Sequence, residues 1–326
     1  IDPRDYDATR FDTLHMLYYP FKLDWLNIVP RSGLRLTHYS ETSKRDITTS
    51  DLGTMFGVDN HGQGNQAGSV VNYDNDGGEK LRFIYEGGIE ANTKIYRTWN
   101  DTKNAFWDLD GIRHVAVPYI NYNFIPRPSL SRDNIYYFDD IDRITKQNFV
   151  RLGLKNRLET RQGDWEKQAI YTWMSLENYF DYHFSREKRV DGNKFSSLGD
   201  FGTIFEFTPF SDFTLRSDML IDTNDFSINK YSTSFSYGIT SRWKVSTIYN
   251  YQADYDQRSV YSMGSGLTDI TSGSSFLRRF SKTQNVSFNL DFPIRESTRG
   301  EFGVIYNLND KILDGGRLKL VQNLHC

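Results

Sequence analysis

The sequence has 326 residues, of which 15% are aromatic and only 8 are proline, and this composition excludes a disordered, proline-rich chain. The formal net charge of −3 gives the chain no general attraction to nucleic acid. No stretch reaches the ~18 consecutive apolar residues of a membrane-spanning helix, and a single cysteine excludes an internal disulfide.

In chain order, the sequence divides into strand-like segments joined by short and long connections. Short turns are expected at residues 30–33, 161–164, 209–212, 238–241 and 293–297. Long polar loops are expected near residues 45–79, 127–146, 184–199 and 254–275, and a final short loop at 309–316. Apart from the connections at 100–111 and 222–225, short and long connections alternate. This order places the short turns at one end of the strands and the long loops at the other.

The segments between these connections alternate apolar and polar residues, which is the signature of β-strands. In the segment 280–292, the residues that share the apolar face are Phe280, Val286, Phe288, Leu290 and Phe292. Residues 150–161, 231–237, 243–252 and 301–309 repeat this pattern. It predicts about 13 or 14 strands, many of them longer than the ~5–6 residues usual in soluble sheets.

Long strands with short turns at one end and long loops at the other are typical of outer-membrane β-barrels. Aromatic residues near the predicted strand ends fit the girdles at the two membrane interfaces; they are Trp25, Tyr96, Trp99, Trp107, Trp165, Tyr179, Tyr182, Trp243, Tyr249 and Tyr251. A soluble β-sandwich or β-helix also alternates and is the alternative. The sequence therefore predicts an all-β, antiparallel transmembrane β-barrel.

One predicted strand carries four basic residues, Arg151, Lys155, Arg157 and Arg161, on a single face. If this face lines a lumen, these side chains are candidates to attract the phosphates of a lipid or the sugars attached to it. The alternative is a mixed-charge wall in which they pair across strands with acids such as Glu86, Glu90 or Glu177.

The loop that follows residue 126 contains three aspartates, Asp139, Asp140 and Asp142. Carboxylates are ligands for hard cations, but the favoured interpretation is a loop in which Asp139 and Asp142 accept hydrogen bonds from turn amides or arginines. The segment 74–77 matches only part of a calcium-loop pattern and is interpreted as a turn. The six histidines form no zinc or hydrolase motif. We therefore expect no metal, no cofactor and no enzymatic activity.

Prolines in two predicted strands are expected to affect how neighbouring strands pair. Pro20 and Pro118 lie within predicted strands and should weaken the pairing locally. The pair Pro126 and Pro128 should mark where a strand ends. His114, beside Arg113 in the same strand as Pro118, is expected to hydrogen-bond at the lumen or the membrane interface.

Anchors in this region resemble the middle of the barrel of the LptD family, the outer-membrane lipopolysaccharide-assembly proteins. In chain order they are His114, Pro118, Tyr122, Pro126, Pro128, Phe138 and Asp139, followed by Asn148, Gly153 and Arg157. The segment 29–39, with Pro30 and Gly33, resembles a hairpin of the same family. The resemblance covers most of the chain as scattered anchors, while the loops at 45–79 and 254–275 match nothing in it.

The resemblance implies that residues 1–326 are one segment of a larger barrel, without its N-terminal periplasmic domain and its terminal strands. It implies insertion of lipopolysaccharide into the outer leaflet, with partners that include a plug lipoprotein of the LptE type, a periplasmic lipopolysaccharide-bridge protein, the barrel-assembly machinery and membrane lipid, and no nucleic acid. It also implies a disulfide from Cys326 to the periplasmic domain; the alternative is an unpaired cysteine. A passive porin or nutrient channel and a soluble, β-rich glycan-binding protein are the competing functions.

Overall fold

A computed structural model describes the chain in segments. The described residues are 8–46, 72–131, 134–136, 138–139, 141–142, 144–162, 169–185, 195–240, 242–257, 278–280, 282–295 and 297–322. All regular elements in these segments are β-strands. No helix in them is long and apolar enough to cross a membrane.

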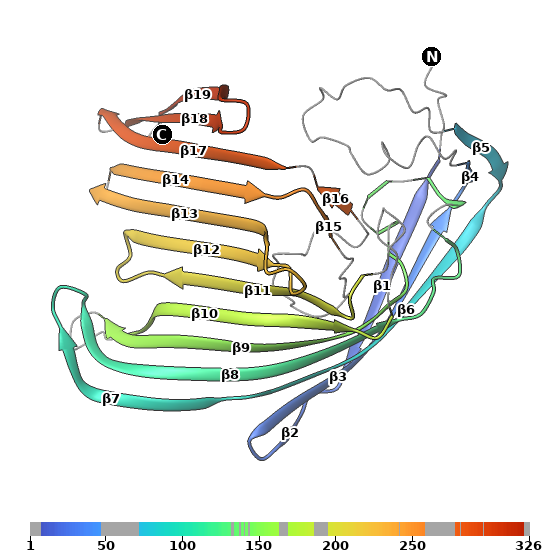
Figure 1. Ribbon diagram of the computed structural model, residues 1–326, viewed down its shortest axis with the longest axis horizontal. Helices are drawn as coiled ribbons and strands as arrows, with labels where there is room; N and C mark the ends of the chain where they lie inside the picture. Colours follow the sequence, from blue (N-terminus) through green and yellow to red (C-terminus); the bar gives the residue numbers. More distant parts are fainter. Residues whose placement is uncertain are drawn as a thin grey trace.

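Fifteen of the described strands form one antiparallel sheet that curves into an open wall (Figure 1). Its path runs β1-β3-β6-β8-β9-β10-β11-β12-β13-β14-β17-β18-β19, with β2 paired to β3 and β7 paired to β8. Within the described segments the edge strands β1 and β19 do not pair, so the sheet is not closed. The all-β, antiparallel fold is confirmed.

The bounds of the strands follow in chain order. They are β1 (Arg10–Tyr18), β2 (Phe21–Leu23), β3 (Leu26–Tyr39), β4 (Thr42–Asp46), β5 (Asn72–Gly77), β6 (Lys80–Thr93), β7 (Ile95–Asn104), β8 (Leu109–Ile125), β9 (Gln147–Gln162), β10 (Ala169–His183), β11 (Leu198–Phe207), β12 (Phe213–Ile221), β13 (Ile228–Thr240), β14 (Trp243–Gln252), β15 (Tyr255–Gln257), β16 (Arg278–Phe280), β17 (Thr283–Arg295), β18 (Thr298–Asn307) and β19 (Ile312–Gln322). The pairs β4–β5 and β15–β16 form two small separate sheets.

The predicted separation of short turns and long loops is confirmed over most of the chain. Short turns join β11 to β12, β13 to β14 and β17 to β18 at one end of the sheet, hereafter the short-turn end. The connection predicted near 100–111 is a tight turn at 105–108, at this same end, because β7 and β8 extend to Asn104 and Leu109. The side chain of Asn104 ties this turn by accepting hydrogen bonds from the amides of Phe106 and Trp107.

The prediction of a turn at residues 30–33 is wrong. Pro30 and Gly33 lie inside β3, where they pair with Ile89 and Glu86 of β6. The turn lies at Asp24, six residues before Pro30 in the sequence. Asp24 has a φ of 47°, which is the left-handed conformation that two-residue hairpins favour. Proline and glycine are common in turns, but both also occur inside strands at places where the pairing is interrupted.

Two strand prolines, Pro30 and Pro118, lie where the neighbouring strand breaks. The carbonyl of Pro30 accepts a hydrogen bond from the amide of Tyr19 at 3.1 Å. Because the N–H and C=O of one residue point to the same side of an antiparallel strand, the missing N–H of Pro30 also faces Tyr19, directly before Pro20, where β1 gives way to β2. Pro118 likewise lies opposite Thr93, the last residue of β6 before the break at Lys94 that separates β6 from β7. The predicted weakening at Pro20 and Pro118 is confirmed.

The sheet has one apolar face and one polar face. Val286, Phe288 and Leu290 lie opposite Tyr306, Val304 and Phe302 of the next strand, which confirms the predicted alternation. We call the face that carries them the apolar face and the opposite one the polar face.

The burial of the two faces is the reverse of that in a soluble protein. On the apolar face, Leu81, Phe83 and Ile120 are 49%, 46% and 42% exposed. On the polar face, Arg82 and Glu86 are fully buried and Arg151 is 1% exposed. No second sheet covers the apolar face within the described segments. A continuous apolar band that faces outward fits a membrane and excludes the β-sandwich.

Candidate functional site

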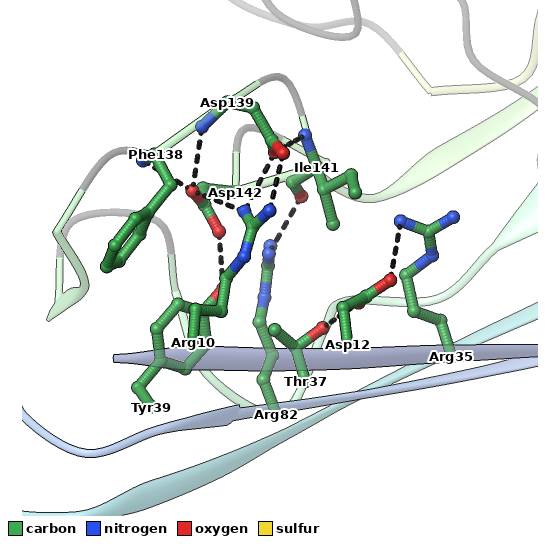
Figure 2. A network of polar contacts seen from close by, with 10 residues as sticks. All are labelled: Arg10, Asp12, Arg35, Thr37, Tyr39, Arg82, Phe138, Asp139, Ile141 and Asp142. Carbon is green, nitrogen blue, oxygen red and sulfur yellow. Dashed lines mark hydrogen bonds and ion pairs between the residues drawn. The ribbon is translucent and has the colours of Figure 1, made fainter. Parts of the chain in front are cut away.

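The loop between β8 and β9 folds back onto the polar face of β1, β3 and β6, on the side toward which the sheet curves (Figure 1). Strand β8 ends at Ile125, directly before Pro126, as the proline pair predicted. We call residues 126–146 the docked loop. Figure 2 shows its contacts with the strands below.

Asp142 is the central residue of this contact (Figure 2), with only 2% of its side chain exposed. Its carboxylate accepts hydrogen bonds from the Tyr39 hydroxyl at 2.5 Å and from Arg10 Nη1 at 3.0 Å. It also accepts from the backbone amides of Phe138 at 2.7 Å and Asp139 at 3.1 Å. A single buried carboxylate thus joins the loop's own turn to strands β1 and β3.

Arg10 and Asp139 form a second connection between the loop and β1. The Arg10 guanidinium donates to both carboxylate oxygens of Asp139, at 2.8 and 2.5 Å. This hydrogen bonding lowers the pKa of Asp139 below its ordinary value. Arg10 also lies over the Phe138 ring, at 5.3 Å from its centroid.

Arg82 of β6 binds the loop through backbone carbonyls of the described residues. Its guanidinium donates to the backbone carbonyls of Leu130 at 3.1 Å, Ile141 at 3.0 Å and Ile144 at 2.6 Å. Arg82 is fully buried, so these carbonyls replace its hydration. A small apolar cluster of Ile84, Ile125 and Ile144 lies beside it. The docked loop is therefore held by charge, hydrogen bonds and apolar contact together.

The hydrogen bonds of the acidic loop agree with the favoured interpretation, in which Asp139 and Asp142 accept from turn amides and arginines. Asp139 also accepts from the Ile141 amide at 2.8 Å, so N–H donors surround both carboxylates. Within the residues that the structure describes, no group of three potential ligands is arranged to hold a metal ion. Asp140 lies outside the described residues, as do the side chains of 74–77.

The four basic residues of β9 share a strand, and each of them pairs with an acid, which lies on a neighbouring strand for Arg151, Lys155 and Arg161 and on β9 itself for Arg157. Arg151 forms a bidentate ion pair with Asp181 at 2.7 and 2.9 Å, and its guanidinium lies 4.1 Å from the centroid of the Tyr179 ring. Tyr179 was expected in an aromatic girdle, and this is wrong: the ring lies on the polar face, 2% exposed. Alternation places Tyr179 there because it follows Glu177 by two residues.

Lys155 lies 3.5 Å from Glu177, whose carboxylate also accepts the Tyr119 hydroxyl at 2.6 Å. This is the cross-strand pairing that the alternative interpretation named.

The remaining two basic residues of β9 are also paired. Arg157 lies 3.6 Å from Glu159, which is shared with Arg113 of β8. Arg161 lies 3.6 Å from Asp110 near the short-turn end. A role for the four β9 cations toward lipopolysaccharide stays a prediction.

Other predicted site residues are dispersed. His114 lies on the apolar face opposite Leu158, and its Nε2 lies 3.1 Å from the side-chain oxygen of Asn156. Strand β19 runs toward the short-turn end, as expected for the segment before Cys326, but Cys326 itself lies outside the described residues.

Sequence reasoning missed the partners of the docked loop. Arg10 and Tyr39 lie 132 and 103 residues from Asp142, so no local motif joins them. The available signal was weak: Arg82 stands at a polar position of an alternating strand, as many charged residues do.

Comparisons with known proteins identify a family and two structures that are similar in fold. A family model described as "LptD: LPS transport system D" matches residues 2–298. Two solved structures are similar at low sequence identity. The siderophore receptor PirA from Acinetobacter baumannii is 10% identical, and the match covers 92% of this chain and 45% of the receptor with a TM-score of 0.42. The FrpB iron transporter from Neisseria meningitidis is 10% identical, and the match covers 95% of this chain and 44% of the transporter with a TM-score of 0.35. The chain thus spans less than half the length of these structures. No curated protein matches it.

Proposed function

The chain belongs to the LptD family, and from this premise we propose that it forms part of the barrel that passes lipopolysaccharide from the periplasm into the outer leaflet of the outer membrane. The observation that carries the proposal is the family match over residues 2–298, which includes the docked loop and strands β1 to β17. The outer membrane is its location.

The two faces of the sheet support this function. An outward band of exposed apolar side chains suits acyl chains, and a charged inner wall suits the phosphates and sugars of lipopolysaccharide. The β9 cations are paired with acids, so that part of the wall is mixed in charge rather than strongly cationic. We propose that such a wall lets a sugar chain pass without holding it tightly.

We propose transport and not catalysis, so no bond of the substrate is broken. The sheet is then one segment of a larger barrel, completed by further strands and fed by a periplasmic domain. The partners that fit this role are a plug lipoprotein of the LptE type, a periplasmic lipopolysaccharide-bridge protein and the barrel-assembly machinery.

Depletion of the full-length protein in its own cells tests the proposal. Newly made lipopolysaccharide should fail to reach the surface, as measured by labelling of intact cells, while the amounts of other outer-membrane barrels stay unchanged. Normal surface labelling after complete depletion would reject the proposal. In planar bilayers, the purified protein with its lipoprotein should show no steady conductance, whereas a porin conducts.

A further inference from the structure

A hollow of about 340 Å³ lies at the short-turn end of the sheet, away from the docked loop. It spans the ends of β13, β14, β17, β18 and β19. The charged residues of its lining are Arg242, Lys244, Arg295, Arg299, Asp212 and Asp291. In an outer-membrane barrel the short turns face the periplasm, so this hollow lies at the periplasmic rim.

The hollow is cationic in a way that β9 is not. Within the described residues, Arg242, Lys244 and Arg295 form no ion pair, whereas each of the four β9 cations has a carboxylate within 4.0 Å. Arg299 lies 3.3 Å from Glu301. With Asp212 and Asp291 as the only acids of the lining, four cations face two carboxylates. The excess of positive charge leaves room for an anion.

The backbone brings these cations together from two neighbouring hairpins. Lys244 stands opposite Asp291 in the β14–β17 ladder, and Arg299 stands opposite Pro293 in the β17–β18 ladder. The turn that carries Arg242 is tied by the Thr240 hydroxyl, which accepts from the amides of Arg242 at 3.3 Å and Trp243 at 3.1 Å. The hydroxyls of Ser297 and Thr298 add neutral donors to the lining. Guanidinium, ammonium and hydroxyl donors around one hollow are the chemistry that binds phosphate.

Apolar side chains on the other face of the same turns indicate that the hollow lies at the depth of the lipid headgroups. The Trp243 ring packs against Phe292 at 6.0 Å between centroids, and Trp243 and Ile294 are 39% and 47% exposed. Tryptophan at a strand end is typical of the membrane–water interface. An anion bound in the hollow therefore lies close to the depth of phosphates at the inner surface of the membrane.

We propose that this hollow binds the phosphorylated sugar headgroup of lipopolysaccharide as it enters the barrel, with Arg242, Lys244 and Arg295 as the phosphate ligands. This rests on the proposed function. The volume is at the low end of ligand pockets, which span ~300–1,000 Å³, and so takes a phosphorylated sugar and leaves the acyl chains in the membrane.

Binding to the full-length protein with its lipoprotein, in detergent, tests the site. The variant R242Q/K244Q/R295Q is compared with the control K22Q/K94Q/K311Q, which removes the same charge from exposed lysines outside the hollow. The probes are lipid A with its phosphates, the same lipid dephosphorylated, phosphatidylglycerol and inorganic phosphate. We expect the site variant to bind phosphorylated lipid A about tenfold more weakly, since it removes three exposed cations whose individual contributions are each modest.

The control variant and dephosphorylated lipid A separate the explanations. Wild-type affinity of the control variant, and equal binding of dephosphorylated lipid A to all three proteins, support the site. Equal weakening of the two variants would overturn it, because general charge then explains the loss. Binding of phosphatidylglycerol or inorganic phosphate as tight as that of lipid A would overturn the assignment to lipopolysaccharide.

Depletion keeps the two proposals distinct. If depletion blocks surface lipopolysaccharide but the site variant binds normally, only the site is rejected. If depletion has no effect, the transport function is rejected whatever binds.

Discussion

Replacement of Asp142 by asparagine should release the docked loop. The carboxylate accepts four hydrogen bonds, from Tyr39, Arg10 and two loop amides, and its side chain is 2% exposed. Asparagine keeps one acceptor oxygen and turns an NH₂ group toward these donors. Removing one partner of a buried ion pair costs about 3–5 kcal/mol. The equilibrium between docked and released loop should therefore shift by a factor of about 100 or more.

Hydrogen–deuterium exchange of the full-length protein in detergent measures this shift. Peptides that cover residues 126–146 should exchange about 100-fold faster in D142N, because loop opening limits amide exchange. Strands β11 to β14 should exchange as in the wild type, which shows that the barrel is folded. The matched control is Asp139→Asn, in the same loop and also bonded to Arg10, but with 44% of its side chain exposed. Its effect should be several-fold smaller.

Two results would refute this reasoning. Unchanged exchange over 126–146 in D142N would mean that Arg82 and the isoleucine cluster hold the loop without Asp142. Equal acceleration in D139N and D142N would mean that burial of the carboxylate does not decide the cost.

Three further outcomes are expected. Arg151→Met should lower stability by about 3–5 kcal/mol, because it leaves the buried Asp181 unpaired; urea unfolding in detergent measures this, and an unchanged midpoint would contradict it. Gly202→Ala should cost about 1–3 kcal/mol by overpacking, since an added Cβ meets the Tyr179 ring; a heat-modifiability shift on gels reports it. The lowered pKa of Asp139 means that its contribution to loop docking is present above about pH 4 and is lost as the pH falls through the lowered value. Protection of residues 126–146, measured as the exchange rate relative to the intrinsic rate at the same pH, should fall only below about pH 4, and a loss of protection near about pH 6 would point to another group.

The sequence by itself determined the class of fold, the two faces and most of the connections. Alternation in 280–292 placed Val286, Phe288 and Leu290 on one face, since side chains of a strand point to opposite sides in turn. The loop that begins at Pro126 and the turn at 209–212 followed from local chemistry, because proline and the turn-forming residues act within a few positions.

Only the tertiary structure decided what contacts what across the sheet. Whether Pro30 made a turn or bridged a gap depended on the neighbouring break at Pro20, which no local pattern shows. The β9 cations had the same alternation whether they were free or paired, and Asp181 and Glu177 on β10 settled that. The acidic loop has a structural role because the fold places Arg10, Tyr39 and Arg82 beneath it, where they bind its carboxylate and carbonyl oxygens. Such contacts depend on strand register and on the return of a long loop, and these are properties of the whole sheet.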